Sequence, residues 1–172
     1  MSFSSLTLPI EGGCSCGHVR YQIKSKPLIV HCCHCRWCQR QTGAAFALNA
    51  LFEAVDVELL KGDVSEKLIP SPSGKGQIIA RCPKCEIAVW SNYFMNGINE
   101  LIRFIRVGTL DDPDQLPPDV HIFTSTKQPW VNLPTNDLVM DEFYDYEKTW
   151  TKDNLNRKKA LMAIVEGRNT PK

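Results

Sequence analysis

The cysteines constrain this chain more than any other residue type, because all eight fall into three clusters and none stands alone. The clusters are Cys14 and Cys16; Cys32, Cys33, Cys35 and Cys38; and Cys82 and Cys85. Thiolates spaced C-x-C or C-x-x-C can reach a single ion, and this spacing is typical of zinc sites. The pattern therefore predicts metal ligation by every cluster.

An even number of cysteines also fits a disulfide framework, so the expected compartment matters. Residues 1–10 have neither a basic start nor a long apolar run, and no segment approaches the ~20 apolar residues of a membrane span. We therefore expect a cytoplasmic protein, in which stable disulfides are rare. A metal-free redox C-x-x-C pair is disfavoured as well, because no βαβ pattern surrounds either pair.

A chain of 172 residues is long enough to bury a hydrophobic core without depending on disulfides or metal ions for its stability. Charged residues make up 23% of the chain and the formal net charge is +1. Nothing in this balance favours a nucleic-acid or membrane partner, and we predict neither.

Apolar and polar residues alternate at 18–24 and 55–59, which predicts strands there. Further strands are predicted at 67–69, 77–81, 87–91, 101–107 and 120–123. Residues 44–52 are expected to form a buried strand, with a helix as the alternative. A short helical turn is predicted at 35–41, ended by Gly43, and a helix at about 153–166, with Asp153 as N-cap and Gly167 as its stop. The predicted class is mainly β with one C-terminal α-helix. Four aromatic residues are interpreted as core: Trp90, Phe94, Phe104 and Trp130.

The two outer cysteine pairs combine naturally into one closed structural zinc site, because each two-residue hook supplies half a tetrahedron. The middle cluster differs, because adjacent Cys32 and Cys33 in an extended chain point to opposite sides. Either Cys33 or Cys32 therefore joins Cys35 and Cys38, and both choices leave three thiolates with an open fourth position. The alternative is a second closed structural zinc, completed by the remaining cysteine or by one of two histidines, His31 and His34.

Taken together, these motifs resemble the glutathione-dependent formaldehyde-activating enzymes, a family grouped with centromere protein V. The shared residues span 12 to about 133 and comprise Gly12-Gly13-Cys14-x-Cys16-Gly17-x-Val19-x-Tyr21; Cys33-His34-Cys35-x-x-Cys38 with Gly43; Cys82-x-x-Cys85; and His121-Ile122 with Ser125, Lys127, Pro129 and Trp130. Two features depart from the family pattern: Glu86 stands where a glycine is common, and Cys32 is an additional thiol.

The resemblance implies a domain of several small packed antiparallel sheets with zinc-ribbon-like knuckles over residues 1–134, followed by an extension at 135–172. It implies two zinc ions per chain. The structural zinc is assigned to Cys14, Cys16, Cys82 and Cys85, and the open, catalytic zinc to Cys33, Cys35 and Cys38. The extension is acidic and then amphipathic, so we expect it to pack on the domain or on a second subunit of a homodimer.

The activity implied by the resemblance is that of a carbon–sulfur lyase acting on S-(hydroxymethyl)glutathione or a related thiol adduct. Zinc would make a reactive thiolate available or polarise the aldehyde. Arg36, Arg40 and Lys127 are candidates to bind the carboxylates of glutathione, and His121 is an acid–base candidate through the family motif alone. The alternative is a non-catalytic zinc module that binds another macromolecule, although no basic stripe with interleaved aromatic residues favours nucleic acid.

Overall fold

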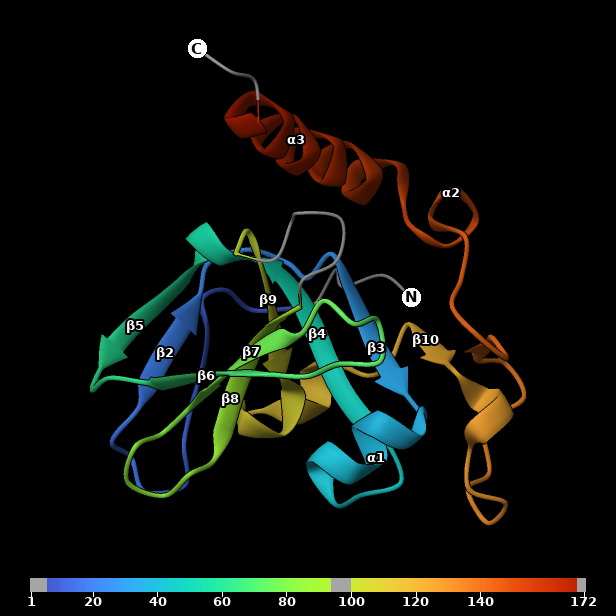
Figure 1. Cartoon of the computed structure of the whole chain (residues 1–172), viewed down its shortest axis with the longest axis horizontal. Coiled ribbons are helices and arrows are strands. Elements are labelled where there is room, and N and C mark those ends of the chain that lie inside the picture. The colour runs from blue at the N-terminus through green and yellow to red at the C-terminus, as the bar shows by residue number, and fades with distance from the viewer. Residues whose placement is uncertain (1–5, 94–99, 170–172) are drawn as a thin grey trace.

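The structure is a computed structural model that describes residues 6–93 and 100–169. Within these residues eleven strands form two sheets (Figure 1). The smaller sheet has the order β1 (Ile10–Gly13), β2 (Arg20–Ile23), β5 (Val57–Lys61). The larger sheet has the order β11 (Leu138–Val139), β10 (Val120–Ile122), β3 (Ile29–Cys33), β4 (Ala47–Glu53), β9 (Ile102–Arg106), β8 (Ala88–Tyr93), β7 (Gln77–Arg81), β6 (Ser65–Ile69). The prediction of a mainly β fold with a C-terminal helix is confirmed.

Strand β10 interrupts the antiparallel pattern of the larger sheet, because it runs parallel to both β3 and β11. Its register with β3 places His121 beside Cys32. Neighbours directly across two strands carry their side chains on the same face. Two residues that are far apart in the sequence therefore project together from the sheet.

The larger sheet separates two hydrophobic cores. Val30, Ala50 and Phe52 face a core that they share with the smaller sheet. The alternate residues Ile29 and Leu51 face a second core, which is built with residues from the C-terminal part of the chain. Strand β3 is buried along its whole length and serves both cores. Most of the 44–52 segment lies in strand β4, so the helical alternative is excluded.

Helix α1 (Arg36–Thr42) follows β3 directly. The Cys35 sulfur accepts a hydrogen bond from the Cys38 amide at 3.3 Å, which caps the first turn. Gly43 ends the helix with φ of 68°, a left-handed conformation that glycine adopts without steric cost, as predicted. Within the described part of the chain, single 3₁₀ turns lie at Ala54–Asp56, Val107–Thr109, Pro113–Gln115 and Thr124–Thr126.

The C-terminal segment contains α2 (Tyr146–Thr149), which was not predicted, and α3 (Lys152–Asn169). The predicted helix is confirmed, but both boundary residues were wrong. The Thr151 hydroxyl, rather than Asp153, accepts from a first-turn amide, that of Asn154, at 3.2 Å. Gly167 lies inside the helix, because a flexible residue alone does not stop a helix whose backbone bonds continue.

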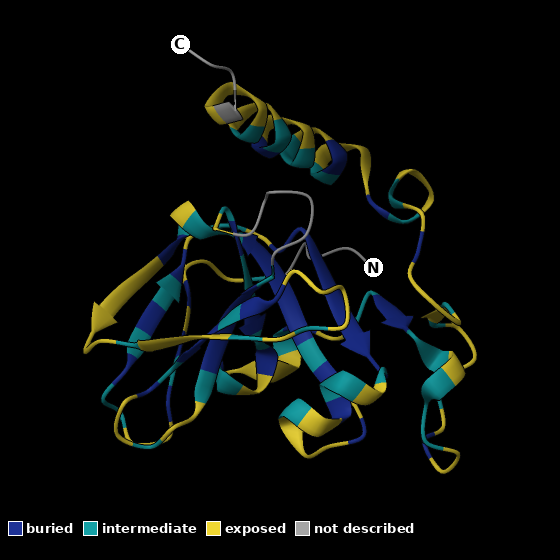
Figure 2. Cartoon of the chain, viewed as in Figure 1, coloured by how far each residue is buried: buried dark blue, intermediate teal, exposed yellow. Residues whose placement is uncertain are grey.

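Helix α3 lies along the end of the larger sheet, with its half-buried and buried residues toward that sheet (Figure 2). Leu155 and Leu161 belong to the second core, whereas Ile164 is 46% exposed. Arg157 forms a two-pronged ion pair with Glu53 at the end of β4 and also donates to the Lys26 carbonyl at 3.0 Å. The boundary at residue 134 stays a prediction.

The aromatic residues divide between core and surface. Trp90 is 2% exposed and Phe104 packs against the second core, as expected. Trp130 is 68% exposed, so its assignment to the core was wrong, because the proline-bounded loop that carries it runs over the surface. Phe94 lies outside the described residues. None of the described helices has the length and apolar character needed to cross a membrane.

Candidate functional site

The two outer cysteine pairs meet at one point, although they come from different sheets. Cys14 and Cys16 lie in the turn between β1 and β2, and Cys82 and Cys85 in the turn between β7 and β8. All four sulfurs lie within 4.8 Å of one another, with 3.5 Å from Cys14 to Cys16 and 3.7 Å from Cys16 to Cys82. A tetrahedron with Zn–S bonds of about 2.3 Å has edges of about 3.8 Å, so the four-cysteine group fits zinc.

Backbone amides point at the sulfurs of this four-cysteine group. The Val19 amide donates to Cys14 at 3.3 Å, and the Lys84 amide donates to Cys82 at 3.4 Å. Burial alone would raise the pKa of Cys14, but hydrogen bonds from Val19, Cys16 and Cys82 outweigh it and lower the pKa to about 6. These hydrogen bonds favour the thiolate form of Cys14, whereas the pKa of Cys16 is raised to about 11, where the hydrogen bond from His18 that lowers it is outweighed by those with Cys14, Cys85 and Cys82 and by burial.

Each hook of the four-cysteine group turns through the left-handed region of backbone space. Gly17, which follows Cys16, has φ of 71°. Glu86 has φ of 60°, which explains why glycine is common there in the related family. All eight cysteines, which lie within the described residues, are free thiols.

The second group consists of Cys33 at the end of β3, Cys35 at the cap of α1 and Cys38 within α1. Their sulfurs also lie within 4.8 Å of one another. The hydrogen bond between Cys33 and Cys35 raises the pKa of Cys33 and lowers that of Cys35. Three thiolates this close repel one another, so only a bound cation allows all three to lose their protons. Among the described residues, this three-cysteine group offers three donors to an ion.

Arg106, the last residue of β9, places a half-buried positive charge near this three-cysteine group. Burial lowers the pKa of the guanidinium, and the negative charges of Cys38 and Cys33 oppose that shift. Its Nη1 donates to the Asn49 side-chain oxygen at 2.8 Å. Sequence reasoning missed Arg106, although a charged residue in a mostly apolar predicted strand was a usable signal.

Cys32 belongs to neither group and joins His34 and His121 on the opposite face of β3 from Cys33. Their ligand atoms also lie within 4.8 Å of one another, and all three residues are buried. Burial raises the pKa of Cys32 to about 12 and lowers that of His34 to about 4. We call these residues the Cys–His–His group. Sequence reasoning named each residue singly but not the group, because it depends on the pairing of β10 with β3.

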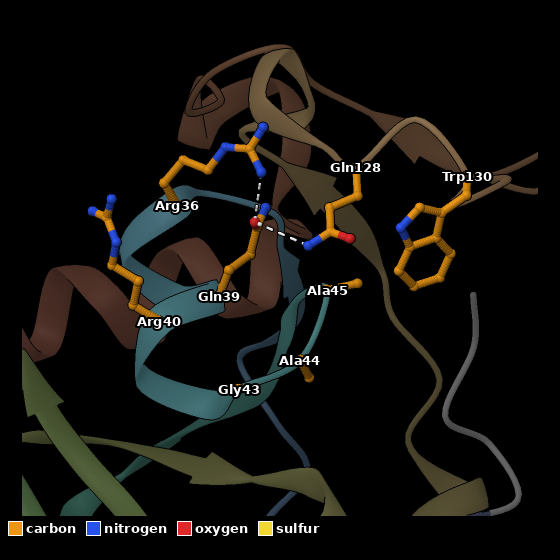
Figure 3. A pocket seen from close by; sticks show the side chains of 8 residues that line it. All are labelled: Arg36, Gln39, Arg40, Gly43, Ala44, Ala45, Gln128 and Trp130. Carbon is orange, nitrogen blue, oxygen red and sulfur yellow. Dashed lines mark hydrogen bonds between the residues drawn. The ribbon is translucent and has the colours of Figure 1, made fainter.

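A cleft of about 690 Å³ opens beside helix α1 (Figure 3). Its lining residues are Arg36, Gln39, Arg40, Gly43, Ala44, Ala45, Gln128 and Trp130. In the close-up, Arg36 and Arg40 project from the helix at one side and the Trp130 ring stands at the other, with Gln39 and Gln128 between them. The volume falls within the ~300–1,000 Å³ typical of small-molecule pockets.

Gln39 connects the cleft to residues 33–38, which we call the cysteine loop. Its amide nitrogen donates to the His34 carbonyl at 2.6 Å and to the Thr126 carbonyl at 3.1 Å. Its oxygen accepts from Arg36 at 2.9 Å and from Gln128 at 3.5 Å, the two bonds drawn in Figure 3. This buried amide therefore fixes both walls of the cleft relative to residues 33–38.

The cleft contains two of the three predicted carboxylate-binding cations. Arg36 and Arg40 line it, whereas the Lys127 ammonium donates to the carbonyls of Gln128, at 3.2 Å, and Val131, at 2.6 Å. Among the described residues that line the cleft there is no cysteine. Cleft and three-cysteine group are instead linked through helix α1, which carries Cys38 between Arg36 and Gln39.

A family model described as glutathione-dependent formaldehyde-activating enzyme matches residues 9–126. The chain belongs to this family. The matched range of the formaldehyde-activating family includes all three cysteine-containing groups and ends before the C-terminal helices, so the resemblance seen in the sequence is confirmed. No curated protein matches the chain. A solved Rhodobacter sphaeroides protein, a Northeast Structural Genomics target, is 17% identical over 76% of this chain and 98% of its own, with a TM-score of 0.44.

Proposed function

We propose that this protein is a zinc-dependent carbon–sulfur lyase that acts reversibly on S-(hydroxymethyl)glutathione or a related thiol adduct. The supporting observation is the convergence of three cysteines at the start of helix α1, which also lines a cationic cleft, in a member of the formaldehyde-activating family. Family membership supports a glutathione-related thiol as the substrate.

Two zinc ions per chain are proposed, one in the four-cysteine group and one in the three-cysteine group. Both donor sets fit the ion, because their sulfurs converge within 4.8 Å and none is consumed in a disulfide. When bound at the three-cysteine group, zinc supplies a Lewis acid that lowers the pKa of a thiol or polarises a carbonyl.

In the direction of adduct formation, a carbon–sulfur bond forms between glutathione and formaldehyde, and the thiol proton is transferred to the carbonyl oxygen. In the reverse direction the same bond breaks and the proton returns to sulfur. No oxidant or reductant is required. The chain must therefore bind one thiol, orient it toward the aldehyde carbon and tolerate a transient charge.

The cleft residues suit these tasks. Arg36 and Arg40 are proposed to bind the two carboxylates of glutathione, because guanidinium groups match carboxylate geometry. The exposed Trp130 ring is proposed to cover the peptide portion, and Gln39 is a positioning residue that holds the cleft against the cysteine loop. The charge of Arg106 is proposed to offset the net negative charge that three thiolates leave around one divalent ion. Arg106 is therefore expected to favour binding of an anionic sulfur.

The test is an NMR titration of the zinc-loaded protein with glutathione, with and without formaldehyde. We expect amide shifts in residues 33–40, and exchange between free and adducted glutathione faster than the uncatalysed rate. Cys33→Ser should abolish the excess exchange. Arg36→Gln should weaken glutathione binding, while Lys152→Gln, an exposed substitution on α3, should leave it unchanged.

Zinc content is the second measurement. The proposal requires at least two zinc ions per chain, and a value of one would contradict it. Absence of any shift in residues 33–40 would favour the alternative, a non-catalytic zinc module that binds another macromolecule.

A further inference from the structure

The Cys–His–His group brings three metal donors together from two strands. His121 of β10 is paired in register with Cys32 of β3, and His34 follows two residues after Cys32 on the same face. The Cys32 sulfur lies 3.5 Å from His34 Nε2, which lies 3.0 Å from His121 Nδ1. The donors therefore converge although 87 residues separate the two histidines.

These distances agree with tetrahedral coordination. Bonds of about 2.3 Å to sulfur and 2.0–2.1 Å to nitrogen give edges of about 3.5 Å between sulfur and nitrogen and about 3.3 Å between two nitrogens. Small movements of buried side chains would satisfy both. One thiolate with two imidazoles suits zinc or copper, whereas magnesium and calcium prefer oxygen donors.

Asp137 supplies the outer partner that metal-bound histidines usually have. Its Oδ2 lies 3.0 Å from His121 Nε2, and both side chains are largely buried, with 14% and 8% exposed. A proton on Nε2 donates to this carboxylate and leaves the Nδ1 lone pair directed at His34 and Cys32. A carboxylate in this position fixes the tautomer and raises the basicity of the ligand.

Hydrogen bonding among the donors alone accounts poorly for the arrangement. His34 Nε2 faces both the Cys32 sulfur and His121 Nδ1, yet one ring nitrogen offers either one proton or one lone pair. A cation at the point of convergence would accept the lone pairs of all three donors. The charges of a Cys32 thiolate and of Asp137 would also balance a divalent ion in this buried place.

We propose that Cys32, His34 and His121 form a third metal site, of the zinc type, with Asp137 orienting His121. The site is structural rather than catalytic, because Cys32, His34 and His121 are only 2%, 0% and 6% exposed. In addition, the Phe46 ring lies 5.5 Å from the His34 ring. The site fastens the short strand β10 to β3, and β10 leads into the turn containing Thr126, which Gln39 holds beside the cleft.

Anomalous diffraction at the zinc absorption edge, from crystals of the full zinc-loaded chain, tests this site directly. We expect three peaks per chain, one of them between Cys32, His34 and His121. Two peaks, or a third peak elsewhere, would overturn the proposal and leave a hydrogen-bonded network at this position.

Variants give a solution readout that does not depend on crystals. Cys32→Ala should lower the zinc content from three to two per chain, whereas Val30→Ala, which truncates a buried residue on the same face of β3, should keep three. Asp137→Asn should weaken one of three zinc affinities by about 10–100-fold. A zinc content of three in Cys32→Ala would refute the site.

The third site does not depend on the proposed activity. Cys33→Ser removes a donor of the three-cysteine group only, so the diffraction peak at Cys32 should persist in that variant. Loss of turnover with this peak retained would separate the two proposals.

Discussion

Cys14 and Cys33 offer a matched comparison of the two cysteine groups, because both side chains are buried with 7% exposed. Replacing either by serine buries a hydroxyl in place of a thiol, at a similar cost of about 1–3 kcal/mol. The difference in unfolding free energy between the two variants therefore reports how much each cysteine group stabilises the fold.

The size of that difference follows from the loops that the two groups close. The four-cysteine group joins Cys16 to Cys82, which are 66 residues apart. A cross-link over such a loop stabilises the folded state by about 4 kcal/mol on the chain-entropy model used for disulfides, against about 2 kcal/mol for the five residues from Cys33 to Cys38. Cys14→Ser should thus be about 2 kcal/mol more destabilising than Cys33→Ser, or about 4–8 °C in melting temperature.

The assay is urea unfolding of the zinc-loaded variants, with zinc content measured on the same samples. Cys85→Ser should behave like Cys14→Ser, and Cys38→Ser like Cys33→Ser, because each pair shares one group. Removing zinc from the wild-type protein with a chelator should lower stability by more than any single Cys→Ser change. Equal losses of unfolding free energy for Cys14→Ser and Cys33→Ser would refute the argument that the four-cysteine group stabilises the fold more than the three-cysteine group does.

Three further substitutions test other parts of the structure. Glu86→Gly should raise the free energy of unfolding by about 0.5–1 kcal/mol, because it relieves a left-handed backbone at φ of 60°; a lower urea midpoint would contradict this. Arg157→Met should cost about 3 kcal/mol, since it removes the partner of the Glu53 carboxylate, whose side chain is 13% exposed. This loss of stability should exceed that of Glu53→Gln, and thermal unfolding measures both. Trp130→Ala should change stability by less than about 0.5 kcal/mol because the ring is 68% exposed, yet weaken glutathione binding measured by calorimetry; unchanged binding would remove the ring from the site.

Local patterns predicted most of the fold. The alternation at 18–24 and 55–59 identified β2 and β5, because a period of two matches a pleated surface, and the mostly apolar run at 44–52 identified β4. The pattern failed where pairing is decided by distant residues. Strand β1 contains two glycines and β11 has only two residues, so neither carries an alternation that would distinguish it from a turn.

The candidate site divides in the same way. Cysteine spacing predicted that the two outer pairs combine, and the extended geometry of β3 predicted that Cys32 and Cys33 would separate. Spacing left open which of these two joins Cys35 and Cys38, and only the family resemblance assigned Cys33. The structure brings Cys33, Cys35 and Cys38 together. The Cys–His–His group and the position of Arg106 depend on strand order in the larger sheet. No spacing within one segment reveals that β10 runs parallel to β3. The orientation of Lys127 toward backbone carbonyls was equally invisible, because it depends on the fold of its own loop.

Strand β3 carries a cysteine on each face, so the face on which a residue lies decides which group of metal donors it can join. A deletion or insertion of one residue before Cys32 would reverse both faces, so that Cys33 would point at the histidine of β10 and Cys32 toward helix α1. A change of two residues would restore the faces and only shift the strand. Length variation in this segment should therefore be tolerated in steps of two, a rule set by donor chemistry as much as by packing.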